Sequence, residues 1–204
     1  MDTARSTLQF KITLRHITPR IWRRIEVPAS YSFWDLHVAI QDAMGWLDSH
    51  LHVFRVRNPE TRQDEEIGIP DDDPFEGDPV YLPGWTVPIT KYFYLGGMRA
   101  QYEYDFGDGW EHDVELESVG RREPGTKYPR CLAGERACPP EDCGGPPGYE
   151  RLLEILCDPT DAEYEQTLEW ADGQFDADAF SPERVRFDNP KVRWRKAFGG
   201  RRTR

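Results

Sequence analysis

The sequence lacks the features that would insert the protein into a membrane or export it. No apolar run approaches the roughly 20 residues that span a bilayer, and residues 1–7 are polar, with no apolar stretch of signal-peptide type behind them. These absences predict a cytoplasmic protein without a membrane partner. In a reducing compartment, its four cysteines are expected to be thiols or metal ligands rather than disulfides.

The sequence also lacks the common enzyme motifs. It contains no Walker loop, no dinucleotide-binding glycine fingerprint after a strand, no nucleophile elbow and no HExxH pair. A serine resolvase would need a nucleophilic serine on the first strand with supporting arginines, whereas Ser6 lies close to the terminus. The sequence therefore indicates none of these catalytic classes.

The composition is that of a globular protein, but the charge is distributed unevenly along the chain. The 204 residues are 38% hydrophobic and 13% aromatic, which is enough for one domain with a proper core. Residues 26–183 hold eleven basic and thirty-five acidic side chains, a net charge of −24, whereas residues 184–204 hold nine basic groups against Asp188. We predict one domain over residues 1–183, followed by a basic, partly flexible tail over residues 184–204.

An acidic body repels polyanions, so contact with nucleic acid is expected only through the basic ends. The tail is the stronger candidate, and a tail that is merely solvated or folds back on the body is the alternative. The candidate nucleic-acid-binding residues are Arg193, Arg195, Lys196, Arg201 and Arg202.

Hydrophobic periodicity predicts an α+β fold. Residues 8–14 and 21–27 alternate as two strands of a hairpin, and residues 33–44 carry a helical apolar stripe that Ser32 and Asp35 cap and Gly45 ends. We expect further strands at 51–57, 99–106 and 112–119, helices at 148–157 and 161–171, and irregular segments over 58–88 and 120–147. This order predicts a mixed or antiparallel sheet with a helix packed after the first hairpin, a β-grasp-like start, long irregular loops and C-terminal helices.

Two segments concentrate groups that bind metals. Cys131, Cys138 and Cys143 supply three soft ligands within thirteen residues, and a bound zinc would need a fourth ligand, for which His50, His52 and His112 are available. The closely paired ligands of the usual structural zinc site are absent. The alternative is that Cys131 and Cys138 are small buried residues under a proline-stiffened loop. Cys157, on the apolar face of a predicted helix, is expected in the core.

Carboxylates and an imidazole at one locus could hold a metal ion and polarise water. The candidate catalytic residues on that ground are Asp105, Asp108, His112 and Glu141. Turn formation is the alternative reading of Asp105 and Asp108, because Asp108-Gly109 suits a tight connection. His50 and His52 are expected on one face of a strand, which suits a metal or a phosphate but also suits half-exposed edge positions.

Several of these motifs together resemble the plasmid pRiA4b ORF-3-like family, whose members are also labelled passenger TnpR-like proteins of insertion elements. The resemblance runs in order from about Leu8 to Trp170 and implies an α+β fold and an association with plasmids or other mobile elements. Its motifs are Ile21–Arg24 (IWRR), Ala43–Trp46 (AMGW), Asp48–Phe54 (DSHLHVF), Tyr102–His112, Cys131–Gly145 and Gly148-Tyr149.

Three functions are open on these grounds. The preferred one is an accessory or interaction protein of a plasmid or mobile element, whose Asp/His/Cys region is structural or metal-binding and whose partner is a protein or the DNA of that element. The alternatives are a metal-dependent hydrolase or nuclease and a DNA-binding module that acts through its basic termini.

Overall fold

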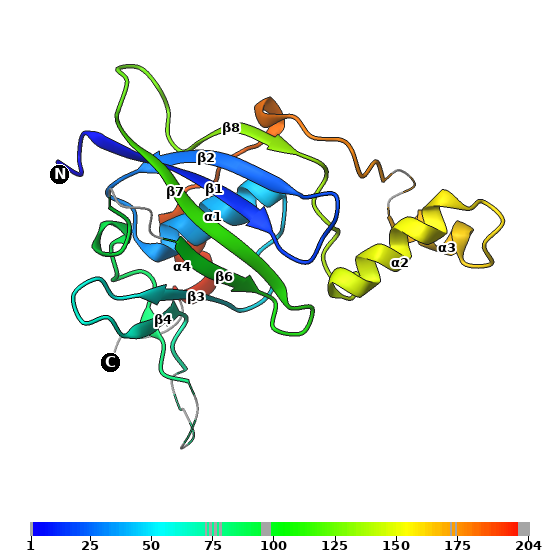
Figure 1. Cartoon of the computed structure of the whole chain (residues 1–204), viewed down its shortest axis with the longest axis horizontal. Coiled ribbons are helices and arrows are strands. Elements are labelled where there is room, and N and C mark those ends of the chain that lie inside the picture. The colour runs from blue at the N-terminus through cyan, green and yellow to red at the C-terminus, as the bar shows by residue number, and fades with distance from the viewer. Residues whose placement is uncertain are drawn as a thin grey trace.

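The computed structural model describes residues 2–71, 73, 75, 77, 79–94, 99–171, 173 and 175–199. Within these residues, eight strands form one mixed sheet in the order β5-β4-β3-β6-β7-β1-β2-β8, antiparallel except between β4 and β5, which confirms the predicted α+β class (Figure 1). The strands are β1 (Ser6–Leu14), β2 (Trp22–Pro28), β3 (His52–Arg57), β4 (Asp64–Gly68), β5 (Leu82–Pro83), β6 (Arg99–Tyr104), β7 (Trp110–Arg121) and β8 (Arg130–Glu135).

The helices lie on one face of the sheet and beyond its edge (Figure 1). They are α1 (Phe33–Met44), α2 (Gly145–Cys157), α3 (Tyr164–Trp170) and α4 (Pro190–Phe198), with short 3₁₀ helices η1 (Ile89–Lys91) and η2 (Pro182–Arg184). No helix in the described ranges is both long and apolar enough to cross a bilayer.

The first hairpin forms as predicted. Phe10 of β1 faces Ile25 of β2 in the antiparallel register, and both side chains are fully buried. The intervening residues of β1, such as Gln9 and Lys11, are only half-buried. This alternation places every second side chain in the core, as period-two patterning requires.

Helix α1 has the limits that its sequence pattern predicts. The Ser32 side chain accepts a hydrogen bond from the Asp35 backbone N–H, and the Asp35 carboxylate accepts one from Ser32, so a capping box starts the helix. Gly45 ends it in the left-handed conformation, at φ 92°. The buried face includes Phe33, which meets the Phe54 ring edge-on at 5.1 Å. The helix is thereby fixed against β3.

Three strands, β4, β5 and β8, fall within segments that were predicted to be irregular. β4 pairs with β3, and its sequence, DEEIG, is acidic because it lies near an edge of the sheet, where only Ile67 reaches the core. β8 pairs with β2 at the opposite edge, with a shift in register between Arg24 and Ile25. Edge strands need bury only part of their side chains, so their alternation is weak.

Cys157 is exposed, so the expectation that it lies in the core is wrong. Helix α2 buries Tyr149, Leu152 and Ile155, but its C-terminal end projects past the sheet together with α3 (Figure 1). Cys157 is the last residue of α2. The apolar pattern around it therefore continues beyond the part of the helix that has a packing partner.

The C-terminal segment, expected to be a partly flexible tail, is helical and packed in its described part. The Trp34 indole N–H donates to the Pro190 carbonyl oxygen at 3.1 Å, and the Phe198 ring meets the Trp34 ring at 5.4 Å. Helix α4 thus covers the outer side of α1 (Figure 1). The sequence pattern did not predict this packing, because α4 is short and rich in basic residues. Arg201 and Arg202 lie outside the described residues.

We predict that Phe198→Ala lowers the free energy of unfolding by about 3 kcal/mol, because removing a buried phenyl ring leaves a cavity between α1 and α4. Lys196→Ala, an exposed change in the same helix, should shift stability by less than about 0.5 kcal/mol. Urea unfolding followed by tryptophan fluorescence measures both. Equal, small effects would mean that α4 does not contribute to the folded core.

Candidate functional site

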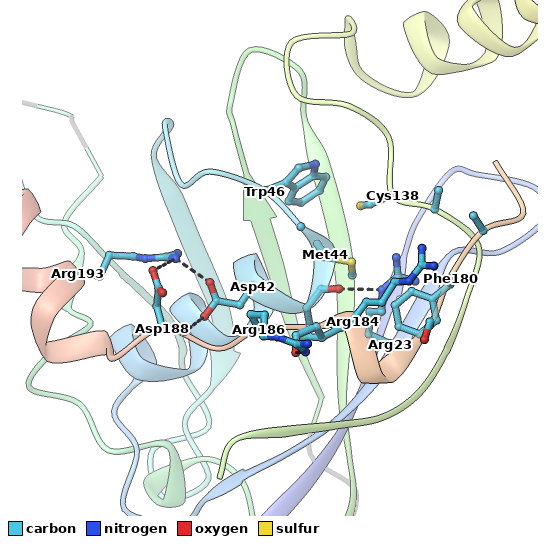
Figure 2. Close-up of a pocket in the computed structure, with 16 residues that line it drawn as sticks. Arg23, Asp42, Met44, Trp46, Cys138, Phe180, Arg184, Arg186, Asp188 and Arg193 are labelled. Atoms are coloured by element: carbon cyan, nitrogen blue, oxygen red, sulfur yellow. Dashed lines mark hydrogen bonds and ion pairs between the residues drawn. The ribbon is translucent and has the colours of Figure 1, made fainter. Parts of the chain in front are cut away.

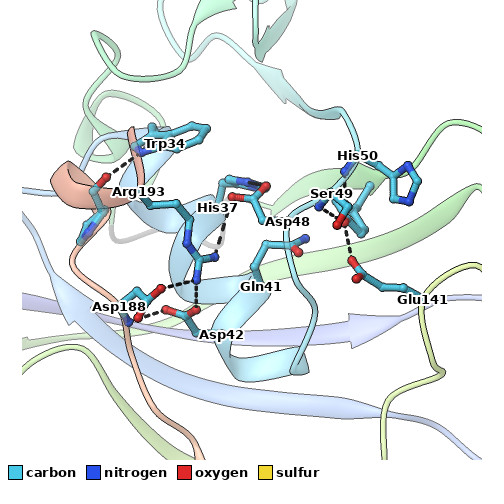
Figure 3. A network of polar contacts seen from close by, with 12 residues as sticks. Trp34, His37, Gln41, Asp42, Asp48, Ser49, His50, Glu141, Asp188 and Arg193 are labelled. Atoms are coloured by element: carbon cyan, nitrogen blue, oxygen red, sulfur yellow. Dashed lines mark hydrogen bonds and ion pairs between the residues drawn. The ribbon is translucent and has the colours of Figure 1, made fainter. Parts of the chain in front are cut away.

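Three chain segments meet beside the C-terminal end of β6: residues 46–51, 105–109 and 139–144. The Tyr104 hydroxyl group joins two of them, since it accepts backbone hydrogen bonds from Ser49 (2.9 Å) and His50 (3.4 Å) and donates to the Glu141 carboxylate at 2.5 Å (Figure 3). Burial and the neighbouring Glu141 raise the pKa of Tyr104 above its ordinary value. The hydroxyl therefore stays protonated and remains a donor to Glu141.

The same three segments bring together one histidine and two carboxylates, here called the three-loop site. The His50 Nε2 atom lies 3.0 Å from Asp142 Oδ1 and 3.5 Å from Asp105 Oδ2. One ligand atom from each of the three residues falls within 4.8 Å of the others, and the described residues contain no second group of this kind. Asp105 is only 8% exposed, whereas Asp142 is exposed. The site is therefore open to solvent on the Asp142 side.

The two carboxylate oxygen atoms of Asp105 make different contacts, one with the turn backbone and one with His50. Its Oδ1 accepts hydrogen bonds from the backbone N–H groups of Gly107 (2.9 Å) and Asp108 (3.3 Å), as in an Asx turn. Its Oδ2 faces His50. Asp105 has a left-handed backbone with φ 56°, a conformation that aspartate tolerates better than most residues. The turn reading and the site reading of this residue are therefore compatible.

Asp108 and Trp46 anchor the 139–144 segment rather than joining the three-loop site. The Asp108 carboxylate accepts a hydrogen bond from the Gly144 backbone N–H at 3.2 Å. The Trp46 indole N–H donates to the Pro139 carbonyl oxygen at 2.9 Å, while its ring stacks on Tyr104 at 5.1 Å. These contacts place the cysteine-containing loop against the 102–112 region.

The other predicted histidine ligands are buried elsewhere. His52 stacks on the His37 ring, with centroids 3.5 Å apart, and burial lowers its pKa well below the ordinary value. His112 is fully buried, and loss of hydration lowers its pKa to about 4, so its ring is neutral at pH 7. His50 precedes β3 and so does not share a strand face with His52. Of the three, only His50 is both accessible and next to carboxylates.

The three predicted thiol ligands pack against the hydrophobic core. Cys131, Cys138 and Cys143 are free thiols at its margin. Burial raises the pKa of both Cys138 and Cys143 to about 12, so without a bound metal ion these thiols are protonated at neutral pH. In the described part of the chain, the thiols do not form a three-ligand group with a histidine.

The Arg193 side chain is paired with carboxylates of the protein itself. It donates to Asp42 and Asp188, both at 2.7 Å, and its side chain is 18% exposed (Figure 3). Arg195 and Lys196 are exposed on α4. Of the candidate nucleic-acid-binding residues that the structure describes, only these two present their charge to solvent as the predicted DNA contact requires.

Sequence reasoning missed Asp142, although it named the adjacent Glu141. The available signal was weak: an acidic pair directly before a cysteine and two glycines. Asp142 joins His50 because its backbone turns through a left-handed conformation at φ 60°, which sequence spacing does not specify.

Comparison with known proteins gives consistent matches over most of the chain. The family model described as plasmid pRiA4b ORF-3-like protein matches residues 6–184, which contain the whole three-loop site. The uncharacterized protein y4hQ of Sinorhizobium fredii (strain NBRC 101917 / NGR234) is 38% identical over 203 residues, covering 94% of this chain and 96% of that protein. The crystal structure of the protein of unknown function MM3350 from Methanosarcina mazei Go1 matches with a TM-score of 0.84 and 43% identity, covering 91% of this chain and all of that one.

Two glycines test how tightly the loops are held. Gly109 and Gly145 have nearly the same φ, 67° and 69°. A Cβ at Gly145 would lie 2.3 Å from the Asp108 carbonyl oxygen, whereas one at Gly109 would meet nothing within 4 Å. We predict that Gly109→Ala costs about 1 kcal/mol, from the left-handed strain alone, and that Gly145→Ala costs at least about 1 kcal/mol more.

Thermal or urea unfolding of the two variants, measured in parallel, makes this comparison. Similar losses of stability would show that the 105–109 turn and the start of α2 are not in close contact.

Proposed function

The chain belongs to the plasmid pRiA4b ORF-3-like family, and we propose that it is an accessory or interaction protein whose three-loop site binds a divalent metal ion. The observation that carries the proposal is the convergence of His50, Asp105 and Asp142, from three separate segments, within ligand distance of one another. We place the protein in the cytoplasm, where a protein partner or the DNA of the mobile element would meet it.

The electrostatics of the three-loop site favour a cation. Asp105 and Asp142 bring two carboxylates to one imidazole, and like charges at this separation repel unless a positive charge lies between them. A protonated His50 supplies one positive charge, whereas a divalent ion supplies two and leaves the imidazole neutral as a ligand. Carboxylate oxygens with an imidazole nitrogen suit Zn²⁺ or Mn²⁺. We assign the zinc expected from the sequence to this site, since in the described residues the thiols do not form a three-ligand group with a histidine.

The site is braced before any ion binds. Asp105 is held by two backbone N–H groups, and the segment around His50 is held by the Tyr104 hydroxyl group. Groups that support the ligands in this way orient them and reduce the entropy lost on binding. A metal ion would then lock residues 46–51, 105–109 and 139–144 together.

Exposed apolar side chains on these segments support an interaction role. Leu47, Leu51 and Phe106 are exposed, and they belong to the two loops that supply His50 and Asp105. Large exposed apolar groups are typical of surfaces that meet another macromolecule. A metal ion that orders the loops would fix the positions of these side chains for a partner protein.

Metal-dependent hydrolysis is the second candidate. Glu141 favours it, because this carboxylate precedes the ligand Asp142 and is oriented by the Tyr104 hydroxyl group. Glu141 could act as a base toward a metal-bound water, a role for which the buried His112 lacks solvent access. Incubation of the metal-loaded protein with DNA and with a phosphodiester substrate separates this candidate from the interaction role.

We predict that the untagged protein binds one Mn²⁺ or Zn²⁺ ion and that His50→Gln and Asp105→Asn each weaken binding at least tenfold. Asparagine keeps an oxygen that can accept the turn hydrogen bonds and tolerates the left-handed backbone, so Asp105→Asn removes the charge and preserves the turn. His16→Gln is the matched control, because His16 is an exposed histidine beside one carboxylate, that of Glu111.

Isothermal titration calorimetry gives the affinities, and the melting temperature should rise with the ion because the ion binds only the folded protein. If the wild-type protein fails to bind, or if all three variants bind equally well, the three-loop site is an ion pair and not a metal centre.

A further inference from the structure

A second polar site lies at the C-terminal end of α1, where a cleft of about 780 Å³ opens between this helix and residues 179–193 (Figure 2). Four arginines line it, against two aspartates. The charged lining residues are Arg23, Arg184, Arg186 and Arg193, with Asp42 and Asp188. We call this region the arginine cleft. It is a positive region on a chain whose net charge is −11.

Arg23 is a buried cation without a counter-ion. It is 2% exposed, and its guanidinium group donates to the carbonyl oxygens of Ala43 (2.9 Å), Trp22 (2.9 Å) and Glu135 (3.0 Å). No carboxylate in the described residues forms an ion pair with it. The neighbouring Cys138 does not compensate it, since burial raises the pKa of that thiol to about 12 and keeps it neutral. Burying a charge without a partner of opposite sign is unfavourable.

The two aspartates of the cleft do not neutralise the remaining arginines, because both accept hydrogen bonds from Arg193. Arg184 and Arg186 are exposed, and the hydrogen bonds of Arg186 go to the carbonyl oxygens of Glu183 and Val185. The C-terminal end of α1 adds roughly half a negative charge from its dipole. Asp48, from outside the lining, also forms an ion pair with Arg193 at 3.8 Å. Four guanidinium groups against these three carboxylates and the dipole leave the cleft with a net positive charge of about half a unit.

We propose that the arginine cleft binds the phosphate group of a small phosphorylated compound. A phosphomonoester carries a charge of about −1.5 to −2 at pH 7. It would meet Arg23, Arg184 and Arg186, which form no ion pair with a carboxylate of the described residues, and a guanidinium group can donate two hydrogen bonds to one phosphate group. The cleft falls within the range of small-molecule sites, about 300–1,000 Å³, and has room for more than a phosphate group. Met44, Trp46 and Phe180 give it an apolar wall for the organic part of the ligand.

Phe180 helps to hold the buried cation in place for this ligand. The centre of its ring lies 3.9 Å from Cζ of Arg23, a cation–π contact. Arg23 is therefore fixed on one side by the ring and on the other by backbone carbonyl groups, while Arg184 and Arg186 can move toward an entering anion.

The test is calorimetric titration of the full-length protein with adenosine 5′-monophosphate, glucose 6-phosphate and inorganic phosphate, in the presence of a chelator so that the three-loop site contributes nothing. The variant is the double substitution Arg184→Gln/Arg186→Gln. The matched control is Arg57→Gln/Arg99→Gln, which removes the same charge from two exposed arginines of the sheet.

We expect at least one phosphate ester to bind, to compete with inorganic phosphate and to bind at least tenfold more weakly to the cleft variant than to the control. Failure of both esters to bind at millimolar concentration would overturn the proposal. Equal weakening in the two double variants would do so too, because the effect would then be one of net charge. Binding of inorganic phosphate alone would overturn the assignment to a phosphorylated compound.

Discussion

The hydroxyl group of Tyr104 is the junction on which the arrangement of the loops depends. It lies at the end of β6, accepts two backbone N–H groups from the 46–51 segment and donates to Glu141. Without it, two part-buried backbone donors and one carboxylate would lose a hydrogen-bond partner, and a typical hydrogen bond contributes about 0.5–1.5 kcal/mol. The close approach of His50 to Asp105 and Asp142 follows from this contact, because the same hydrogen bonds fix the residues beside the ligands.

The 46–51 segment also connects the two sites that we propose. Asp48 accepts a hydrogen bond from the buried His37 at 2.7 Å and forms an ion pair with Arg193 at 3.8 Å (Figure 3). Arg193 and Trp46 line the arginine cleft, whereas His50 belongs to the three-loop site. A single short segment therefore contacts both sites, and α4 contributes to their support through Arg193.

Sequence periodicity predicted the elements that bury one clear face. The β1–β2 hairpin and α1 follow from alternation and from the Ser32 cap, because most of their apolar side chains point to one core. It failed at the edge strand β8 and at β4, the strand next to the other edge, both of which bury few residues. It also failed at Cys157, where an apolar pattern has no packing partner. Such positions depend on contacts between segments far apart in the sequence.

The position of the three-loop site was predictable in part. The density of carboxylates and histidines around Asp105 and His50 drew attention to the segments that meet there, and the turn residues explained the backbone. Which residues form the three-loop site was not predictable. His52 and His112 are buried and therefore inaccessible, and the left-handed backbone of Asp142 places its carboxylate beside His50. The net charge also concealed the arginine cleft, whose basic side chains come from β2 and from the C-terminal segment.

The central claim is that one cation joins the three loops, and paramagnetic broadening of amide NMR signals by substoichiometric Mn²⁺ tests it most directly. Broadening falls steeply with distance from the ion, so the metal centre predicts selective loss of the signals of residues 49–51, 105–108 and 141–143, with residues 23–25 unaffected. Broadening centred on the acidic strand β4, or spread evenly over the acidic surface, would contradict a metal centre formed by His50, Asp105 and Asp142.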